Sequence, residues 1–263
     1  MSIPSRTIWQ KMISGHLNVS KKPLIVILGP TASGKTAFSL EVAECMRSLP
    51  SADISIYRRF DPEIVNADSR QLYCHLDIGT AKITHSAMGG IPHHLLSVLD
   101  PKEKVTVGWY KDEATTIIDA ILARGHIPLL VGGSMLYISS IIDGLALTGR
   151  GEKQKIPVPY NLLIFGLDAP RPILKERIAD RFEGLLSEGW IEEVQQLLKM
   201  GYTEKDPGFE SLGYREIIQF LHGKLSREKL VGEINRKTMQ YVKRQRTWWR
   251  HDARIHWINQ GGN

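Results

Sequence analysis

The segment that most constrains the fold is Gly29–Thr36, whose sequence GPTASGKT fits the pattern G-x-x-x-x-G-K-[ST] at every fixed position. It follows a short apolar run, Leu24–Leu28, and it leads into an amphipathic run, Lys35–Arg47. A buried strand, a glycine-rich turn and a helix in this order place backbone N–H groups and the positive end of the helix dipole around phosphate oxygens. The sequence therefore predicts a phosphate-binding loop within a parallel α/β sheet.

Two side chains of this loop have chemistry of their own. We expect Lys35 to reach the terminal phosphate and the Thr36 hydroxyl to coordinate Mg²⁺, the cofactor that we predict. The remaining members of the predicted diphosphate-binding or nucleotide-binding site are Gly29, Pro30, Thr31, Ala32, Ser33 and Gly34. The pattern predicts a ligand that carries a diphosphate, and by itself it leaves the rest of the ligand open.

Apolar and amphipathic runs alternate along the rest of the chain. The predicted strands are Leu24–Leu28, Glu63–Asn66, Ile127–Val131, Asn161–Leu167 and a short final segment, Arg254–Ile258. The predicted helices are Lys35–Arg47, Thr106–Arg124, Ser134–Ile142, Arg171–Ser187, Trp190–Met200, Tyr214–Leu221 and Ser226–His251. This order predicts an α/β fold with a P-loop NTPase-like core, a parallel β-sheet flanked by helices and a helical C-terminal half.

The length of 263 residues suits one large domain, which we place at residues 23–263. Residues 1–22 are polar, contain no acidic side chain and predict a loose N-terminal arm, whose basic character also resembles an organelle transit peptide to a small degree. Residues 145–160 lack periodicity and predict a loop or a shortened connection. Residues 170–254 form the helical, basic region of the domain.

Composition limits where such a chain functions. The longest apolar runs, such as Leu24–Leu28, have five residues, which is too short to span a bilayer, and the N-terminus has no apolar signal segment. The two cysteines, Cys45 and Cys74, argue against a secreted disulfide framework. We therefore expect a cytoplasmic protein without a membrane partner.

The net charge of +6 is concentrated in one part of the chain. Residues 223–254 contain ten Lys and Arg but only three acidic residues, so this segment accounts for the whole surplus. Clustered basic residues of this kind favour a polyanionic partner, although a solvated helix with surplus lysines explains the charge equally well.

Asp68 is the acidic residue best placed to act on a ligand of the phosphate loop. It follows the predicted strand Glu63–Asn66, and strand ends of parallel sheets meet at the ligand crevice. The other obvious strand, Ile127–Val131, ends in Gly-Gly-Ser and offers no acid. Asp68 is thus a candidate general base toward a second substrate, and the alternative is that it only caps a helix.

Seven segments together resemble one family, the tRNA dimethylallyltransferases, which are isopentenyltransferases that modify adenosine 37 beside the anticodon. The resemblance extends over about residues 23–257, and the combination of motifs makes it specific. The segments are Gly29–Thr36 (GPTASGKT), Asn66–Tyr73 (NADSRQLY), Asp77–Lys82 (DIGTAK), Pro92–Leu95 (PHHL), Leu130–Tyr137 (LVGGSMLY), Leu212–Glu216 (LGYRE) and Lys243–Arg250 (KRQRTWWR).

This resemblance implies a function for the phosphate loop and its neighbours. The loop would hold the diphosphate of dimethylallyl diphosphate with Mg²⁺, which explains a phosphate loop without an evident acidic strand partner. Asp68 would accept a proton from the adenine N6 amine as that amine attacks the allylic C1. Thr31 would contact the bridge region of the leaving group, and Arg181 would clamp the diphosphate.

The resemblance also implies a tRNA-binding surface. Ser69, Arg70 and Gln71 would meet a flipped adenine together with Asp68 and with Ser134, where the family usually has Thr. Further implied contacts are Gly213, Tyr214, Arg215, Lys243, Arg244, Arg246, Trp249 and Arg250. From helical spacing we expect Trp248 to point inward and Trp249 outward. The partners would be tRNA and dimethylallyl diphosphate, and the enzyme would be a monomer.

The chain departs from the family pattern at one place. Family members usually carry a helical insertion of several dozen residues that grips the anticodon stem, whereas this chain has only residues 145–160 there. Thr148-Gly149-Arg150 resembles the tail of that insertion. A smaller tRNA footprint, a compensating partner or reduced activity would each follow from the loss.

Two other classes of function fit parts of the sequence. A kinase of the P-loop class would bind ATP at the loop and use Asp68 as a base toward a hydroxyl, and a non-enzymatic RNA-binding module would keep the loop without its chemistry. The pair His93-His94 has no further ligands at metal spacing, so we expect it to be structural or RNA-facing and predict no zinc site.

Overall fold

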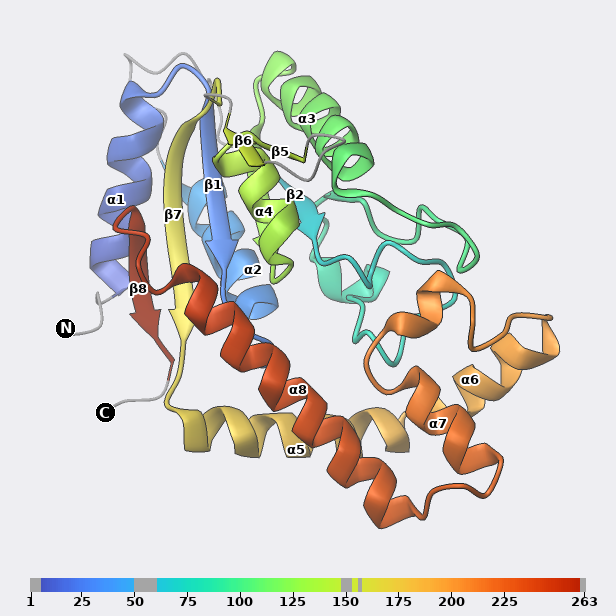
Figure 1. The fold of residues 1–263 in the computed structure, drawn as a ribbon. Coiled ribbons are helices and arrows are strands. Elements are labelled where there is room, and N and C mark those ends of the chain that lie inside the picture. The colour runs from blue at the N-terminus through green and yellow to red at the C-terminus, as the bar shows by residue number, and fades with distance from the viewer. Residues whose placement is uncertain (1–5, 50–60, 148–152, 156–157, 261–263) are drawn as a thin grey trace.

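A six-stranded sheet forms the centre of the protein, with the strand order β3-β2-β4-β1-β7-β8 and parallel pairing throughout (Figure 1). The computed structural model describes residues 6–49, 61–147, 153–155 and 158–260. The strands of the sheet are β1 (Pro23–Leu28), β2 (Pro62–Ala67), β3 (His93–His94), β4 (Ile127–Gly132), β7 (Asn161–Asp168) and β8 (Ile255–Asn259). The predicted parallel α/β fold is confirmed, and the short final strand is part of it.

Helices cover both faces of the sheet, which explains why every residue of β1, β2 and β4 is buried. On one face, Ile25 and Ile27 of β1 pack in a cluster with α1 (Arg6–Val19) and α2 (Lys35–Ser48). On the other face, Leu24, Val26 and Leu28 join a larger cluster with the remaining long helices. Those helices are α3 (Val107–Ala123), α4 (Met135–Ile142), α5 (Arg171–Ser187), α6 (Trp190–Lys199), α7 (Tyr214–Leu221) and α8 (Arg227–Trp249).

The carboxyl ends of the central strands meet at one edge of the sheet. Leu28 of β1 pairs with Gly132 of β4 and with Gly166 of β7, so the loops that follow these strands begin side by side. Helices α5 and α8 pack against each other beyond this edge (Figure 1). None of the helices that the structure describes combines the length and the hydropathy that crossing a bilayer requires.

The expectation of a loose arm at residues 1–22 is wrong for the residues that form α1. Trp9, Ile13 and Leu17 are at most 4% exposed, and the Trp9 ring packs edge-on against Phe38 of α2 with 5.4 Å between centroids. These three apolar residues recur every fourth position and therefore lie on one face of the helix. The polar residues between them conceal this stripe when the segment is judged by composition.

The connection at residues 145–160 contains more regular structure than a loop. Strands β5 (Leu145–Leu147) and β6 (Lys153–Lys155) pair in an antiparallel ladder. The segment Thr148-Gly149-Arg150 lies outside the described residues. Two short 3₁₀ helices, His85–Met88 and Pro207–Glu210, complete the secondary structure of the described residues.

The expected orientation of the two adjacent tryptophans is also wrong. Trp249 is 2% exposed and Trp248 is 39% exposed, the reverse of the prediction. The buried stripe of α8 passes through Thr238, Val242 and Gln245 and ends at Trp249, because the neighbouring helix and strands set the phase of this long helix. Trp248 lies beside the stripe, and its indole N–H donates to Ser139 of α4 at 3.2 Å.

The packing of α1 generates a matched pair of substitutions. Ile13→Ala removes a fully buried side chain, so we expect the free energy of unfolding to fall by about 2–5 kcal/mol. Ile8→Ala, on the same helix at 48% exposure, should change it by less than about 0.5 kcal/mol. Urea unfolding followed by circular dichroism measures both values. Equal, near-zero effects would contradict the docking of α1 on the sheet.

Candidate functional site

The phosphate loop leaves β1 at Leu28 and enters α2 at Lys35. Gly29 adopts a φ of 153°, and a Cβ at this position would lie 2.3 Å from the carbonyl oxygen of Leu167, so only glycine fits. Gly34 caps α2 in the left-handed conformation with a φ of 87°. Ser33 is fully buried, and its hydroxyl has no hydrogen-bond partner among the described residues. The loop thus presents a helix N-terminus and an unpaired hydroxyl at the sheet edge.

Lys35 is held inside the loop that it serves. Its Nζ donates to the carbonyl oxygen of Pro30 at 2.7 Å. Burial lowers the pKa of Lys35 to about 8, while the nearby Asp68 carboxylate acts in the opposite direction and Arg181 lowers the pKa further. An anion in the loop would raise the pKa of Lys35 again, because a nearby negative charge stabilises the ammonium form.

Arg181 of α5 interacts with the same two charged groups. Burial lowers the pKa of Arg181, the Asp68 carboxylate raises it, and one guanidinium N–H donates to the Thr80 carbonyl at 3.4 Å. Two cations and one carboxylate therefore interact beside the phosphate loop. The structure brings together Lys35, Asp68 and Arg181, although more than 140 positions of the sequence separate Lys35 from Arg181.

Asp68 is fixed by its neighbours. Its Oδ1 accepts a hydrogen bond from the Arg70 amide at 2.9 Å, and Asn66 bonds both the Asp68 amide and the Asp68 carbonyl at 3.0 Å. Among the described residues, no hydrogen bond to Oδ2 is recorded. The side chain therefore caps a turn and not a helix, and its second oxygen is available to a substrate.

Ser134 joins the ends of β4 and β2. Its Oγ accepts a hydrogen bond from the Ser69 amide at 2.8 Å and contacts Ser69 Oγ at 3.2 Å, and its amide donates to the Ala67 carbonyl. Ser134 is 7% exposed, so its hydroxyl is committed to this junction. The predicted pair Ser69 and Ser134 is thus brought together beside Asp68.

Two residues of α8 that the sequence did not single out complete the edge. The side-chain amide of Gln245 accepts a hydrogen bond from the Thr31 amide at 3.1 Å and donates one to the Gly133 carbonyl at 2.9 Å. Tyr241 also donates to Gly133, at 3.2 Å, and burial, followed by the Asp68 charge, raises the pKa of Tyr241 to about 12. A glutamine on the buried stripe of α8 is the signal that could have revealed this contact.

Arg70 and Gln71 make structural contacts in this state. The Gln71 amide nitrogen donates to the carbonyls of Thr80 and Ala81 at 3.1 and 3.3 Å. Arg70 donates to the Pro207 carbonyl at 3.3 Å and lies 3.8 Å from the Glu210 carboxylate. Both side chains therefore hold neighbouring loops around Asp68.

The predicted RNA contacts in the LGYRE segment are mostly interior. Tyr214 is fully buried and its hydroxyl donates to Glu193 at 2.7 Å, while Gly213 packs against the Trp190 ring. These two residues cannot present a surface to RNA, because the helices of the core cover them. Arg215 is exposed and donates to the Glu204 carbonyl at 3.1 Å.

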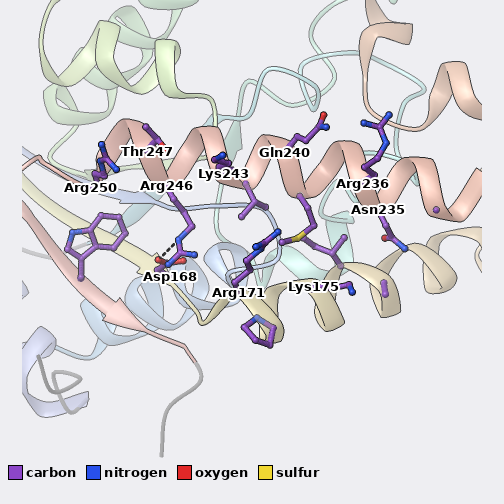
Figure 2. Close-up of a pocket in the computed structure, with 17 residues that line it drawn as sticks. Asp168, Arg171, Lys175, Asn235, Arg236, Gln240, Lys243, Arg246, Thr247 and Arg250 are labelled. Carbon is purple, nitrogen blue, oxygen red and sulfur yellow. Dashed lines mark ion pairs between the residues drawn. The ribbon is translucent and has the colours of Figure 1, made fainter.

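The basic residues predicted on α8 divide between two sides of the helix. Arg244 lies 5.5 Å from the centre of the Tyr241 ring, on the side of the sheet edge. Lys243, Arg246 and Arg250 line a cavity between α8 and α5 on the other side (Figure 2). Trp249, also predicted as an RNA contact, is buried in the core. A single continuous basic face on α8 is therefore excluded.

The adjacent histidines lie on β3, away from the phosphate loop. His94 Nε2 lies 2.6 Å from the Glu63 carboxylate, and His93 Nδ1 lies 2.8 Å from the Ile91 carbonyl oxygen. Arg124 and two histidines surround Glu63, and their hydrogen bonds overcome its burial and lower its pKa to about 2. Within the described ranges, no three His, Cys, Asp or Glu side chains gather as ligands for a metal ion.

Comparison with known proteins adds independent evidence. The family model for IPP transferases matches residues 71–155 and 147–252. The tRNA dimethylallyltransferases of Carboxydothermus hydrogenoformans and Pelotomaculum thermopropionicum are 33% and 31% identical to this chain over 90% of it, and the alignments cover 92% and 91% of those proteins. These alignments run over 301 and 299 positions, more than the 263 residues of the chain, so the relatives contain residues without a counterpart here.

Solved structures agree with this assignment. The tRNA isopentenylpyrophosphate transferase of Bacillus halodurans is 29% identical, with a TM-score of 0.79 over 91% of this chain and 90% of that one. The tRNA isopentenylpyrophosphate transferase of Staphylococcus epidermidis is 28% identical, with a TM-score of 0.77 over 90% and 93%. Fold, motifs and matched length point the same way: the chain belongs to the IPP transferase family, to which the tRNA dimethylallyltransferases belong.

Proposed function

We propose that this protein transfers the dimethylallyl group of dimethylallyl diphosphate to N6 of adenosine 37 in tRNA and releases diphosphate. The observation that carries the proposal is the convergence of Lys35, Arg181 and Asp68 at the phosphate loop. Membership of the IPP transferase family and relatives named as tRNA dimethylallyltransferases support it. We further propose that the enzyme acts in the cytoplasm as a monomer.

The residues divide the reaction between them. The N6 lone pair attacks C1 of the dimethylallyl group, the bond between C1 and the diphosphate oxygen breaks, and the departing oxygen keeps the electron pair. Lys35, Arg181 and the loop N–H groups stabilise the charge that develops there. Asp68 takes the proton from N6 through its free oxygen. Thr31, whose backbone Gln245 holds, is proposed to contact the bridging region of the diphosphate.

The adenine must leave its stack to reach this site, as in other enzymes that modify bases. Ser69, Arg70, Gln71 and Ser134 surround Asp68, and their hydrogen bonds to neighbouring loops support a role in shaping the pocket for the base. We propose that the exposed Arg215 and Arg244 lie toward the incoming RNA.

Mg²⁺ fits the residues at the loop. Thr36 lies exposed at the start of α2, where its hydroxyl can reach a cation bound to the diphosphate. A single hydroxyl suits a cation that keeps water and phosphate oxygens as most of its ligands, and the described residues form no closed protein cage. When bound with the diphosphate, Mg²⁺ would neutralise charge on the leaving group.

A kinase of the P-loop class is the less favoured function. Its support was the phosphate loop together with a carboxylate, and both features are equally required for transfer from a diphosphate. The relatives that cover nine tenths of the chain are named as tRNA dimethylallyltransferases. Binding of dimethylallyl diphosphate in preference to ATP, measured as thermal stabilisation, separates the two functions.

The short connection at β5 and β6 belongs to the same proposal. The two segments that match the family model overlap at residues 147–155, where the usual insertion would be. The greater length of the alignments than of the chain supports the loss of that insertion. We therefore propose that the tRNA footprint is smaller at this side of the protein.

The role of Asp68 gives the first functional prediction. Asp68→Asn keeps the oxygen that accepts the hydrogen bond of the Arg70 amide but cannot take a proton, so transfer should fall by about 10²–10⁴. Affinity for tRNA should stay close to that of the unaltered protein. Incubation with labelled dimethylallyl diphosphate, followed by nucleoside analysis, measures the transfer. A variant with substantial turnover would remove Asp68 as the base.

The lowered pKa of Lys35 predicts how ligand affinity depends on pH. Below pH 8 the lysine of the free protein is already charged, whereas above pH 8 binding of a diphosphate must take up a proton. Affinity for dimethylallyl diphosphate should therefore fall by up to about tenfold per pH unit above 8. Calorimetric titration from pH 7 to pH 10 measures this slope.

Lys35→Arg is the control for this slope, because a guanidinium keeps its charge throughout the range. The variant can bind more weakly overall, but its affinity should lose the pH dependence. An affinity of the unaltered protein that stays constant up to pH 10 would show that Lys35 is fully charged in the free state.

A further inference from the structure

A long cavity lies between α5 and α8, outside the reaction site, and we call it the α5–α8 groove. Its volume is about 1460 Å³. Asp168 at the end of β7 and Trp257 of β8 close one end, and Gly232 of α8 lies at the other. The lining residues of α8 and its C-cap extend from Gly232 to Arg250, a rise of about 27 Å along the helix, so the groove suits an extended ligand.

Cations outnumber carboxylates among the residues that line this groove. Six cationic side chains and one carboxylate, that of Asp168, line it; the cations are Arg171, Lys175, Arg236, Lys243, Arg246 and Arg250 (Figure 2). Arg246 pairs with Asp168 at 2.9 Å, and Arg236 pairs with Glu233 at 2.6 Å. For the other four cations, the described part of the chain provides no recorded ion pair. Cations along one groove repel one another, and a polyanion bound between them would offset this repulsion.

The start of α5 makes the electrostatic potential of the groove more positive. Arg171 is the first residue of the helix, and the first turn contains no acidic residue. A cation at a helix N-terminus is unfavourable, because the dipole already places positive charge there. Arg171 and Lys175 lie one turn apart and are both exposed, so they form the second wall of the groove without a role in the core.

The groove and the reaction site lie on opposite sides of α8. Tyr241 and Gln245 bond Gly133 at the sheet edge, whereas Lys243, Arg246 and Arg250 line the groove. A helix with its side chains is about 10–12 Å across. A ligand in the groove is therefore separated from the reacting base by the body of α8, and one polymer can contact both sides of the helix.

We propose that the α5–α8 groove binds the phosphate backbone of the tRNA substrate at nucleotides outside the one that enters the reaction site. The proposal rests on the proposed function, because the polyanion that must already lie against the other side of α8 is tRNA. It assigns Arg171 and Lys175, which no sequence motif marks, to RNA binding. It also supplies backbone contacts to a chain whose connection at residues 145–160 is short.

The test removes the two cations that α5 contributes to the groove. Arg171→Gln combined with Lys175→Gln takes away two exposed cations and no core contact. The affinity for full-length tRNA should fall several-fold, and the slope of log K against log salt should become shallower by about 1.5, because two phosphate contacts are lost. Fluorescence anisotropy between 50 and 200 mM salt measures both quantities.

The matched control removes the same charge elsewhere. Lys11→Gln combined with Lys22→Gln changes two exposed lysines, one on α1 and one just before β1, that do not line the groove. This variant should keep the salt slope of the unaltered protein. Equal slopes for the groove variant and the control variant would overturn the proposal.

Two further measurements identify the ligand and separate this proposal from the proposed function. A groove variant that loses affinity for inorganic pyrophosphate but not for tRNA would assign the groove to small anions and overturn the proposal. Transfer at saturating tRNA should be retained, because the groove lies outside the reaction site. If the unaltered protein transfers no dimethylallyl group, the proposed function fails, whereas the salt slope still reports whether the groove holds RNA.

Discussion

Parallel pairing of β1 with β4 on one side and β7 on the other is the constraint on which the rest of the structure depends. It aligns Leu28, Gly132 and Gly166, so that the phosphate loop, the turn of Ser134 and the start of α5 emerge at one edge. The close approach of Gly29 to the Leu167 carbonyl exists only because β7 lies beside β1. Asp68 lies at the same edge because β2, the strand before it, pairs with β4 up to Ala67 and Gly132.

Helix α8 separates two electrostatic environments. Toward the sheet edge it contributes neutral groups, the Gln245 amide and the Tyr241 hydroxyl, which hold backbone and leave the charges to Lys35, Arg181 and Asp68. Toward α5 it contributes cations that remain in contact with solvent. Neutral and charged side chains lie on different sides of α8 because burying a charge costs free energy. A cation on the buried stripe would lose its hydration, whereas an exposed cation keeps it. Four of the ten cations of residues 223–254 line this side: Arg236, Lys243, Arg246 and Arg250.

The sequence predicted the sheet well because its central strands are buried on both faces and so appear as continuous apolar runs. It predicted Lys35, Asp68 and Arg181 through motif and resemblance. It did not predict α1, whose three core residues are diluted by polar ones, nor the burial of Trp249, because the phase of a 23-residue helix is set by what packs against it. Lys175 could not be found from local pattern, since the rest of the groove that it lines belongs to other elements.

The contact of Gln245 with Thr31 joins residues that are 214 positions apart. The glycine-rich motif is made early in synthesis, yet its backbone acquires this support only when the last helix has been made and has docked. Both the oxygen and the nitrogen of the Gln245 side-chain amide make hydrogen bonds. Gln245→Glu would replace that nitrogen with an oxygen and place it against the Gly133 carbonyl oxygen. A chain truncated before α8 would keep every residue of the phosphate loop and lose part of what holds the loop in shape.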